Sequence, residues 1–353
     1  MRSIPVEQPG LVAFLEREVW PGASHLRIEE LVRPTGGASW ETFLLRVAFE
    51  RDGALREERA VIKRAPATGP LAPYRVDKDV AIFGALAKSE VPAPPLLAWT
   101  EDPEVFERPF TLTAFVEGAT HDLTKVEQWE VWQRDRESLG IEMLDTLAAL
   151  HRFRWQEHGL GRVMDASGPA AAHAGTFMHR YFDLLARAAE EQGAGIPVWR
   201  DMAAWIEKNA PVVPQDELVL VHGDYRFGNF IWQDTRIVAV VDWERAMLGP
   251  PMQDLAFMCL PLSRRKEPEV MAKAISFDRL ASHWEVASGC AVDFRMLQYY
   301  AVLWQFVEGV NGARALLAGR RDQASTGILA LSNLVIRQTL KLMDDHDAGR
   351  DIL

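Results

Sequence analysis

One stretch, VHGDYRFGNF at residues 221–230, constrains the fold more than any other part of the chain. A short apolar run, Leu218 to Val221, leads into a loop that carries Asp224 and, five positions later, Asn229. A second apolar run then ends at Asp242. Because these polar residues follow short strand-like runs, the pattern predicts that three oxygen-bearing side chains come together at the strand ends.

Such a set of oxygen ligands suits Mg²⁺, a hard cation that proteins usually hold with one or two carboxylates, water and substrate phosphates. In this interpretation Asn229 and Asp242 are the metal ligands. Asp224 is then available to accept the proton of a substrate hydroxyl group as that group attacks phosphorus.

Composition excludes several other kinds of protein. The chain has 353 residues, 48% of them hydrophobic, which is enough for a large core and two domains. Its formal charge of −11 argues against nucleic acid as a partner, since phosphate backbones require clustered Lys and Arg. Two cysteines, Cys259 and Cys290, are too few for a disulfide framework. We therefore expect a protein of a reducing compartment.

The N-terminal residues and the apolar runs bear on localisation. Residues 1–20 lack the charged head and apolar core of a signal peptide. No uninterrupted apolar run approaches the ~18 residues needed to span a bilayer. We expect a soluble, cytoplasmic protein with no membrane partner.

Strand-like patterns dominate the chain before residue 118. Residues 42–50, 59–65 and 110–118 are rich in β-branched and aromatic residues. The turn signal Asp52-Gly53 predicts that the first two form a hairpin. Residues 76–90 have helical spacing of apolar residues. The predicted order is strand, strand, helix, strand.

After Gly118 the pattern becomes mainly helical, with a period of 3.6 residues at 139–153, 177–191 and 296–310. The interruption at 217–246 contains two short strands, NFIW and RIVAVVDW, around a polar turn at residues 233–235. The chain is therefore predicted to be an α+β protein with a small sheet lobe and a larger helical lobe.

The spacing of Asp224 and Asn229, followed by Asp242, is that of the protein-kinase catalytic loop and metal-binding aspartate. With its segments HGDYRFGN and VVDWERAMLGPPMQDLA, the chain resembles the aminoglycoside phosphotransferase and choline kinase family of small-molecule kinases. The resemblance implies a two-lobed, protein-kinase-like fold with a small antiparallel sheet. The expected division is a nucleotide-binding lobe at 1–114, with an N-terminal helical extension, and a helical catalytic and acceptor-binding lobe at 115–353.

The resemblance also assigns residues to the nucleotide. Lys63 lies where the family places its ATP-phosphate lysine, and Asp79, or else Asp77, is expected to orient it from the following helix. The backbone of residues 114–116, including Ala114 and Val116, is expected to hydrogen-bond adenine. A glycine-rich loop just before the strand at 42–50 is expected to approach the phosphates through small residues, which are Gly36, Gly37 and Ser39.

Two other residues are expected to be structural. His222 is predicted to hold the catalytic loop through hydrogen bonds. Asp254 lies in LGPPMQD, where relatives often have Gly-Asp-Pro, and is predicted to cap the helix LAFMCL.

The predicted activity is transfer of the γ-phosphoryl group of ATP, with Mg²⁺, to a hydroxyl group of a small molecule. The resemblance leaves the acceptor open among aminoglycosides, macrolides, choline, homoserine, sugars and hydroxyacyl thioesters, since a shared fold does not choose between them. Three alternatives compete with this interpretation: a nucleotide-binding pseudokinase with a regulatory role, a metal hydrolase using His222, Asp224 and Asp242, and a protein kinase. The last is disfavoured because no Ala-Pro-Glu segment follows Asp242.

Overall fold

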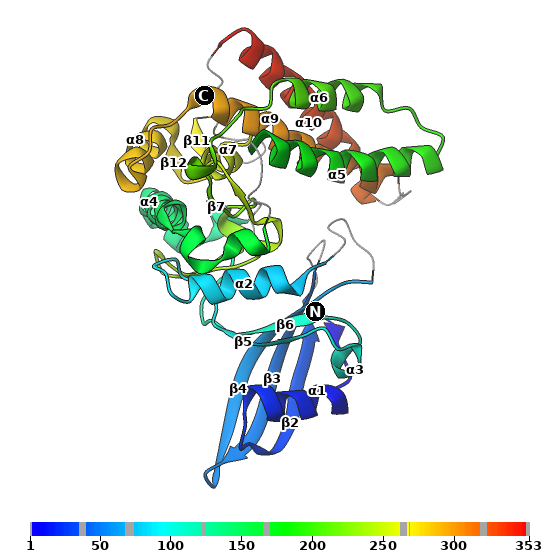
Figure 1. The fold of residues 1–353 in the computed structure, drawn as a ribbon, viewed down its shortest axis with the longest axis vertical. Coiled ribbons are helices and arrows are strands. Elements are labelled where there is room, and N and C mark those ends of the chain that lie inside the picture. Colours follow the sequence, from blue (N-terminus) through cyan, green and yellow to red (C-terminus); the bar gives the residue numbers. More distant parts are fainter. Residues whose placement is uncertain are drawn as a thin grey trace. The chain divides into compact units, whose positions relative to one another are not determined.

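The computed structural model describes residues 2–34, 40–67, 74–121, 125–164, 170–261, 267, 269–317 and 323–350 (Figure 1). The chain divides into two compact units. Unit 1 contains residues 1–118 together with 158–163 and 238–244. Unit 2 contains residues 119–157, 164–237 and 245–353. The chain thus passes from unit 2 back into unit 1 for the segment that carries Asp242.

Unit 1 is built on a six-stranded antiparallel sheet with the order β1-β2-β3-β4-β6-β5. Its strands are β1 (Arg2–Ser3), β2 (Ser24–Arg33), β3 (Glu41–Arg51), β4 (Ala54–Arg64), β5 (Leu96–Thr100) and β6 (Phe110–Ala114). The helices of this unit are α1 (Pro9–Phe14), continued by a π-helical turn (Leu15–Val19), α2 (Val76–Leu86) and α3 (Pro103–Phe106), with a 3-10 turn at Leu160–Arg162.

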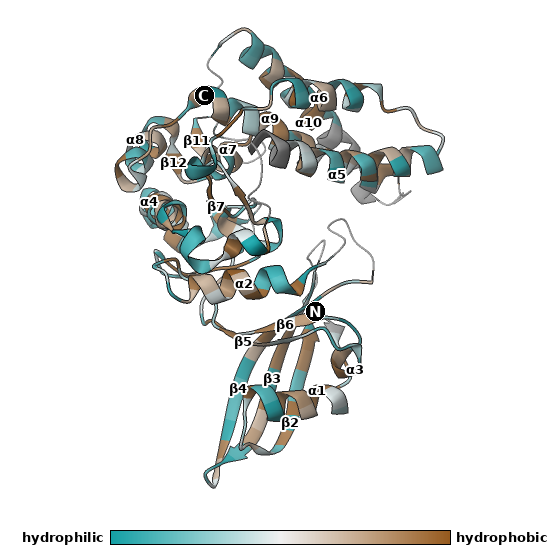
Figure 2. Cartoon of the chain, viewed as in Figure 1, coloured by the Kyte–Doolittle hydropathy of each residue, from teal (hydrophilic) through white to brown (hydrophobic). Residues whose placement is uncertain are grey.

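The hairpin of β3 and β4 is the centre of this sheet. Arg51 pairs with Ala54, so the loop has two residues, and both, Asp52 and Gly53, have positive φ (54° and 73°). Such a turn matches the twist of the flanking strands, and Asp-Gly is a preferred sequence for it. The predicted hairpin is confirmed. Residues 54–59 of β4 are exposed, and Figure 2 shows this end of the strand as hydrophilic.

One face of the sheet packs against α1 and α3 in a core of buried apolar side chains. Phe43 and Leu45 of β3 alternate with less buried neighbours, as a strand with one buried face requires. Phe106 of α3 contacts Phe43 edge to face, with ring centroids 5.2 Å apart, and Phe14 of α1 meets Phe110 of β6 in the same way at 5.5 Å.

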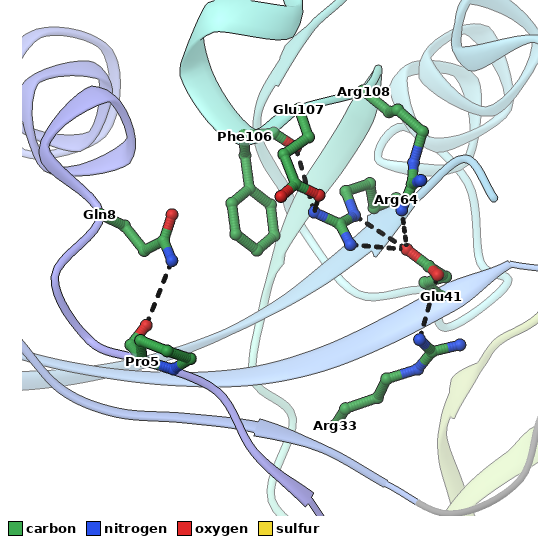
Figure 3. A network of polar contacts seen from close by, with 8 residues as sticks. All are labelled: Pro5, Gln8, Arg33, Glu41, Arg64, Phe106, Glu107 and Arg108. Atoms are coloured by element: carbon green, nitrogen blue, oxygen red, sulfur yellow. Dashed lines mark hydrogen bonds and ion pairs between the residues drawn. The ribbon is translucent and has the colours of Figure 1, made fainter. Parts of the chain in front are cut away.

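An ionic cluster lies where β2 ends and β3 begins (Figure 3). The Glu41 carboxylate accepts hydrogen bonds from Arg33 (3.0 Å), Arg64 (2.9 Å) and Arg108 (2.5 Å). Arg64 also donates to Glu107 (2.7 Å). Since Arg64 is only 7% exposed, it needs these carboxylates to offset its desolvation. The cluster ties the end of β2 and the start of β3 to β4.

Unit 2 is mainly helical. Its α-helices are α4 (Glu130–Arg152), α5 (Ala170–Glu191), α6 (Pro197–Lys208), α7 (Met252–Met258), α8 (Phe277–Ser288), α9 (Phe294–Leu317) and α10 (Gln323–Asp347). Short strand pairs complete it: β7 (Val219–Val221) with β10 (Met247–Gly249), β8 (Phe230–Gln233) with β9 (Arg236–Val240), and β11 (Val270–Met271) with β12 (Ile275–Ser276). Short 3-10 turns lie at Val126–Gln128, Gln215–Glu217 and Phe227–Asn229, and those at Trp155–His158 and Trp243–Arg245 span points where the chain passes from one unit to the other.

Helix α9 forms the core of unit 2, where it packs against α5, α7 and α10. Every side chain from Leu297 to Val307 is buried, which is typical of a helix surrounded by others. The helix begins after Asp293, whose carboxylate accepts the amide N–H of Met296 (2.9 Å) as an N-cap. The preceding helix, α8, ends at Gly289 with φ 78°, the left-handed conformation that glycine adopts at helix ends.

The other segments predicted from periodicity also have the expected structure. Residues 76–90 contain α2, residues 139–153 lie in α4 and the following turn, and residues 177–191 and 296–310 lie within α5 and α9. In the described residues, none of the helices is both long enough and apolar enough to cross a membrane.

Candidate functional site

In unit 1 the functional residues gather around Lys63, which lies on β4 between Thr42 of β3 and Thr111 of β6. The Lys63 ammonium donates to the carboxylate of Asp242 at 2.5 Å. Their side chains are 22% and 30% exposed, so this ion pair is neither fully solvated nor sealed from water.

Asp242 follows β9 and has a φ of 71°, a conformation that is uncommon outside glycine. Holding a residue there costs of the order of 1–3 kcal/mol, which the surrounding structure must offset. The surrounding structure holds Asp242 in this conformation, with its carboxylate hydrogen-bonded to Lys63. Next along the chain, the Glu244 carbonyl accepts a hydrogen bond from Lys78 of α2 (2.9 Å) and ties this segment to that helix.

The electrostatics around Lys63 favour its charged form. Burial lowers its pKa, but the carboxylates of Asp242 and Glu244 more than compensate, so the pKa of Lys63 is raised above its ordinary value. Lys63 is therefore a cation at neutral pH.

The two acidic residues on α2 differ in environment. Asp79 is only 4% exposed, and burial raises its pKa to about 6, against the opposing effect of Lys78 and Lys63. Asp77 instead lies near the surface and forms an ion pair with Arg75 (2.5 Å). Asp79 is thus the acidic residue of α2 in the electrostatic field of Lys63, although the lysine donates its hydrogen bond to Asp242. Whether Asp79 orients Lys63 during turnover stays a prediction.

The predicted adenine-binding backbone lies at the end of β6. The amide of Ala114 donates to Pro95 (2.8 Å) and that of Phe115 donates to Arg59 (3.2 Å), so both N–H groups have protein acceptors. Arg59 also stacks over the Phe115 ring, 3.5 Å from its centroid. Val116 is half-buried beyond them. The glycine-rich loop residues Gly36, Gly37 and Ser39 lie outside the described residues.

In unit 2 the functional residues belong to the loop after β7. Asn229 donates through Nδ2 to both the carbonyl oxygen (2.7 Å) and the carboxylate Oδ2 (2.8 Å) of Asp224. Arg226 donates through Nε to the other carboxylate oxygen, Oδ1, at 2.8 Å. Asp224 is therefore held on both oxygens by donors from its own loop, and this geometry fixes its orientation.

Asp254 of α7, which is fully buried, holds this loop through hydrogen bonds. Its carboxylate accepts the backbone N–H groups of His222 (2.9 Å) and Gly223 (2.8 Å), and the Nε2 of His151 lies 3.2 Å away. Asp254 has the structural role expected of it, but not as the predicted cap of helix LAFMCL. It lies within α7, and its oxygens stabilise the catalytic loop instead.

His222 and Gly223 give this loop its shape. The Nδ1 of His222 accepts the N–H of Asp224 (3.2 Å), which agrees with the predicted structural role. Gly223 has a φ of 79°, and a Cβ there would lie 2.7 Å from the carbonyl oxygen of Arg245. Glycine is therefore required by both conformation and space.

The sequence analysis did not predict the buried ion pair that Arg245 forms. Its guanidinium is 12% exposed and pairs with Glu308 of α9 at 2.8 Å. Burial lowers its pKa, but Glu308, Tyr181 and Asp224 raise it well above the ordinary value. Arg245 is thus a second, buried cation near Asp224. Arg245 and Glu308 are 63 positions apart, so no local sequence pattern predicts that they pair.

Each unit has an oxygen donor of the kind that suits Mg²⁺. In unit 2 both Nδ2 hydrogens of Asn229 are directed at Asp224, which leaves its amide oxygen as a metal-ligand candidate. In unit 1 the candidate is the carboxylate of Asp242. Hard oxygen donors of this kind are those that magnesium prefers. Within the described ranges, no group of three or more His, Cys, Asp and Glu side chains is arranged to hold a metal by itself. Such a site would depend on substrate phosphates and water.

Comparison with known proteins bears on this arrangement. Residues 30–290 match the model of the Phosphotransferase enzyme family. Among curated proteins, Acyl-CoA dehydrogenase family member 11 from Gallus gallus is 30% identical over 203 residues, and family member 10 from Mus musculus is 28% identical over 235. These matches cover 56% and 65% of this chain but only 25% and 20% of the relatives. The chain therefore spans about a quarter of the length of these relatives.

Solved structures show the same fold. A putative aminoglycoside phosphotransferase from Ralstonia eutropha superimposes with a TM-score of 0.68 and 20% identity, covering 97% of this chain and 99% of its own. A spectinomycin phosphotransferase in complex with ADP and its antibiotic has a TM-score of 0.58, 13% identity and coverages of 96% and 99%. An ethanolamine kinase from Plasmodium vivax has a TM-score of 0.55, 12% identity and coverages of 91% and 81%. The predicted two-lobed, kinase-like α+β fold is confirmed.

Proposed function

The chain belongs to the Phosphotransferase enzyme family, and on that premise we propose that it transfers the γ-phosphoryl group of ATP to a hydroxyl group of a small molecule. The family and its kinase relatives confirm the predicted enzyme class, a phosphotransferase with an alcohol group as acceptor. The observation that carries the proposal is the ion pair between Lys63 and Asp242, which joins a strand lysine to a strand-end carboxylate. Phosphoryl transfer needs such a lysine for phosphates and such a carboxylate for metal.

In this proposal Lys63 binds the phosphates of ATP, and Asp79 orients it. The backbone amides of the loop containing Gly36, Gly37 and Ser39 approach the same phosphates. The charge of Lys63, maintained by its carboxylate neighbours, supports this role.

Adenine is proposed to bind the backbone at residues 114–116. Since the amides of Ala114 and Phe115 donate to Pro95 and Arg59, we assign the N–H of Val116 and the carbonyl of Ala114 to the base. Backbone recognition of this kind places no demand on the side chains, which explains why the sequence there is unremarkable in type.

Asn229 and Asp242 are the proposed ligands of Mg²⁺. The bound metal supplies charge neutralisation on the ATP phosphates. Asp242 has a less common backbone conformation, and its carboxylate accepts a hydrogen bond from Lys63. Lys63, its partner in the ion pair, is then free to exchange this contact for a phosphate oxygen.

Asp224 is the proposed catalytic base. Its carboxylate, fixed by Asn229 and Arg226, accepts the proton of the acceptor hydroxyl while the acceptor oxygen bonds to the γ-phosphorus. The bond from that phosphorus to the oxygen of the leaving ADP breaks. Because the transition state is loose, alignment and charge stabilisation supply most of the rate.

The acceptor is proposed from two groups of relatives. Curated relatives carry names of acyl-CoA dehydrogenase family members, which points to a hydroxyacyl-CoA as one acceptor class. Structural neighbours act on spectinomycin and ethanolamine by name, which points to amino alcohols. The sequence relatives are more similar to this chain, so hydroxyacyl thioesters come first in the proposed order, ahead of choline-like metabolites and aminoglycosides.

The proposal is tested by ADP release with Mg-ATP across a panel of hydroxyacyl-CoA thioesters, ethanolamine, choline and aminoglycosides. We expect acceptor-dependent ADP release and a phosphorylated product. Asp242→Ala should abolish turnover, and Asp224→Asn should keep nucleotide affinity while losing transfer. Asp234→Asn, an exposed aspartate at the β8–β9 turn, is the matched control and should behave like wild type.

The competing functions give different results in the same assays. Binding of Mg-ATP without product for any acceptor would favour a regulatory pseudokinase. Hydrolysis that needs metal but no nucleotide would favour a hydrolase. Wild-type transfer in either aspartate variant would remove the assignment of the site.

A further inference from the structure

The ionic cluster at the start of β3 carries more positive than negative charge (Figure 3). Its cations are Arg33, Arg64 and Arg108, and its anions are Glu41 and Glu107. Three positive charges face two negative ones, so one positive charge is in excess. Like charges that are held this close repel each other, and the repulsion is stronger where water is partly excluded.

Nothing else in unit 1 is placed to balance this charge at short range. The described residues supply no third carboxylate at ion-pair distance from the three arginines. Beyond residue 1, the structure leaves residues 35–39 and 68–73 of this unit undescribed, and their sequences contain neither Asp nor Glu. The excess charge is therefore open to a counter-ion from solution.

Arg64 is fully used within the cluster. Its Nε donates to Glu41 (2.9 Å), and its Nη1 donates to Glu107 (2.7 Å) and to the carbonyl oxygen of Phe106 (3.3 Å). Its guanidinium carbon lies 4.8 Å from the ring centroid of Phe43 and 4.4 Å from that of Phe106. Aromatic faces at such distances stabilise a cation. Arg64 is thus the buried, structural arginine of the cluster.

The outer arginines, Arg33 and Arg108, are 43% and 28% exposed. Arg33 donates to Oε1 of Glu41 (3.0 Å) and Arg108 to Oε2 (2.5 Å). The Nε of Arg108 is buried and has no acceptor among the described residues. A buried donor of this kind indicates a place where water or an ion binds. Since this donor belongs to a cation in a cluster with excess positive charge, an anion is favoured over neutral water.

We propose that this cluster is an anion-binding site, in which a phosphate group, free or as a monoester, bridges Arg33 and Arg108. The planar fork of a guanidinium matches the oxygens of a phosphate, which it can bind through two parallel hydrogen bonds. The two arginines already meet at the two oxygens of one carboxylate, so a tetrahedral anion beside Glu41 can contact both.

The site is separate from the proposed ATP site. Lys63 and Arg64 are successive residues of β4, so their side chains point to opposite faces of the sheet. Arg64 lies over Phe43 and Phe106, which belong to the core on the α1 and α3 side. Lys63 instead pairs with Asp242. The anion site therefore does not depend on the proposed function.

The test is calorimetric titration of inorganic phosphate into the full chain at constant ionic strength, with the ATP site filled by Mg-AMP-PNP. We expect saturable binding that weakens as NaCl is raised. Arg33→Gln and Arg108→Gln should each weaken it by about 10- to 100-fold, the effect of one lost hydrogen bond to a charged group. Lys63→Met should bind phosphate as wild type does.

Glu107→Gln gives a readout that a purely structural cluster would not. The Glu107 side chain is 71% exposed and its carboxylate competes with an incoming anion for the charge of Arg64. Removing this negative charge should make phosphate bind several-fold more tightly. This gain keeps the proposal testable even if an arginine variant fails to fold, which thermal unfolding of each variant would show.

Arg46→Gln is the matched control, because Arg46 is 38% exposed on β3 and pairs with Glu30 and Glu57 outside the cluster. It removes the same charge from unit 1 and should leave phosphate affinity unchanged. Competition by glycerol phosphate would assign the site to monoesters, and its failure to compete would assign it to the free ion.

Three results would overturn the proposal. They are a wild type without saturable phosphate binding, arginine variants of the cluster that bind as well as Arg46→Gln, and a Glu107→Gln protein with no gain in affinity. Binding that is lost in Lys63→Met but kept in Arg33→Gln and Arg108→Gln would place the phosphate at the proposed ATP site, which also overturns it. A wild type that transfers phosphate to no acceptor would remove the proposed function and leave this site unaffected.

Discussion

Lys63 and Asp242 form an ion pair at 2.5 Å although 179 positions separate them in the chain. The contact joins β4, a central strand of the unit 1 sheet, to residues 238–244, a segment that belongs to unit 1 although unit 2 residues precede and follow it in the sequence. The surroundings of the Lys63 ammonium in unit 1 therefore depend on a residue that is distant in the sequence.

Removal of this ion pair should cost stability in the absence of nucleotide. A double-mutant cycle with Lys63→Met and Asp242→Asn should give a coupling free energy of about 1 to 3 kcal/mol in urea unfolding, because neither side chain is more than a third exposed. The exposed pair of Arg46 and Glu30, at 3.5 Å, is the control and should couple by less than about 1 kcal/mol. Equal coupling in both cycles would contradict the importance of the Lys63 contact.

The ionised carboxylate of Asp79 should lower the free energy of unfolding at neutral pH. Its pKa is about 6 when folded and about 3.8 when exposed, so the folded state binds the proton more tightly. The stability from this protonated carboxyl is fully present below pH 3.8 and is lost as pH rises to about 6. Asp79→Asn should therefore be more stable than wild type at pH 7, by up to about 3 kcal/mol, with the difference shrinking towards pH 4. Urea unfolding across this range measures it.

Asp77→Asn is the control for that prediction, with the opposite sign. Arg75 lowers the pKa of Asp77, so the contribution of Asp77 to the free energy of unfolding is present at neutral pH and is lost in acid.

If Asp79 also orients Lys63, Asp79→Asn should raise KM for ATP while it stabilises the fold, a trade-off common at functional sites. An Asp79→Asn protein that is less stable than wild type at pH 7 would show that Asp79 is a net stabiliser.

Local signals were sufficient for much of the fold. Asp52-Gly53 predicted the β3–β4 hairpin because a two-residue turn with positive φ needs such residues. The spacing of Asp224 and Asn229 predicted the family and the enzyme class, both confirmed by the family match. The site roles of these residues, by contrast, are proposals that rest on the geometry described above.

Contacts between distant residues could not be predicted from the sequence. Asp254 was expected to cap the helix beside it, since capping depends on neighbouring residues. Its actual partners are the amides of His222 and Gly223, more than 30 positions away. Arg245 and Glu308 likewise form an ion pair between residues that are far apart in the sequence. In each case the partner is determined by tertiary packing, for which one sequence offers no periodic or local signal.

The Glu41 cluster should be a major source of stability in unit 1. Burial raises the pKa of Glu41, but the opposing effects of Arg64, Arg108 and Arg33 are together larger. The pKa of Glu41 is therefore below its ordinary value. Its contribution is therefore present above the ordinary pKa of a glutamate and is lost as pH falls through the folded value. Glu41→Gln should cost about 3 to 5 kcal/mol at pH 7, because Arg64 is left buried without its main carboxylate.

Urea unfolding of Glu41→Gln at pH 7 and in acid measures this effect, which should shrink as the pH falls. Glu29→Gln removes a carboxylate from the surface pair with Arg27 and is the control. It should cost less than about 1 kcal/mol. A Glu41→Gln protein as stable as this control would mean that Arg64 is satisfied by Glu107 alone.

Gly223 should be the most sensitive glycine of the catalytic loop. Its φ of 79° costs an alanine about 1–2 kcal/mol, and the Cβ would also lie 2.7 Å from the Arg245 carbonyl oxygen, a backbone atom that cannot rotate away. Gly193→Ala is the matched control, because Gly193 has a φ of 61° with nothing within 4 Å of the added carbon. Thermal unfolding should show a clearly larger loss for Gly223→Ala, and ADP release should fall in that variant alone. Similar losses in the two variants would mean that the loop shifts to accommodate the methyl group, and that Asp224 does not depend on the contact between Gly223 and Arg245.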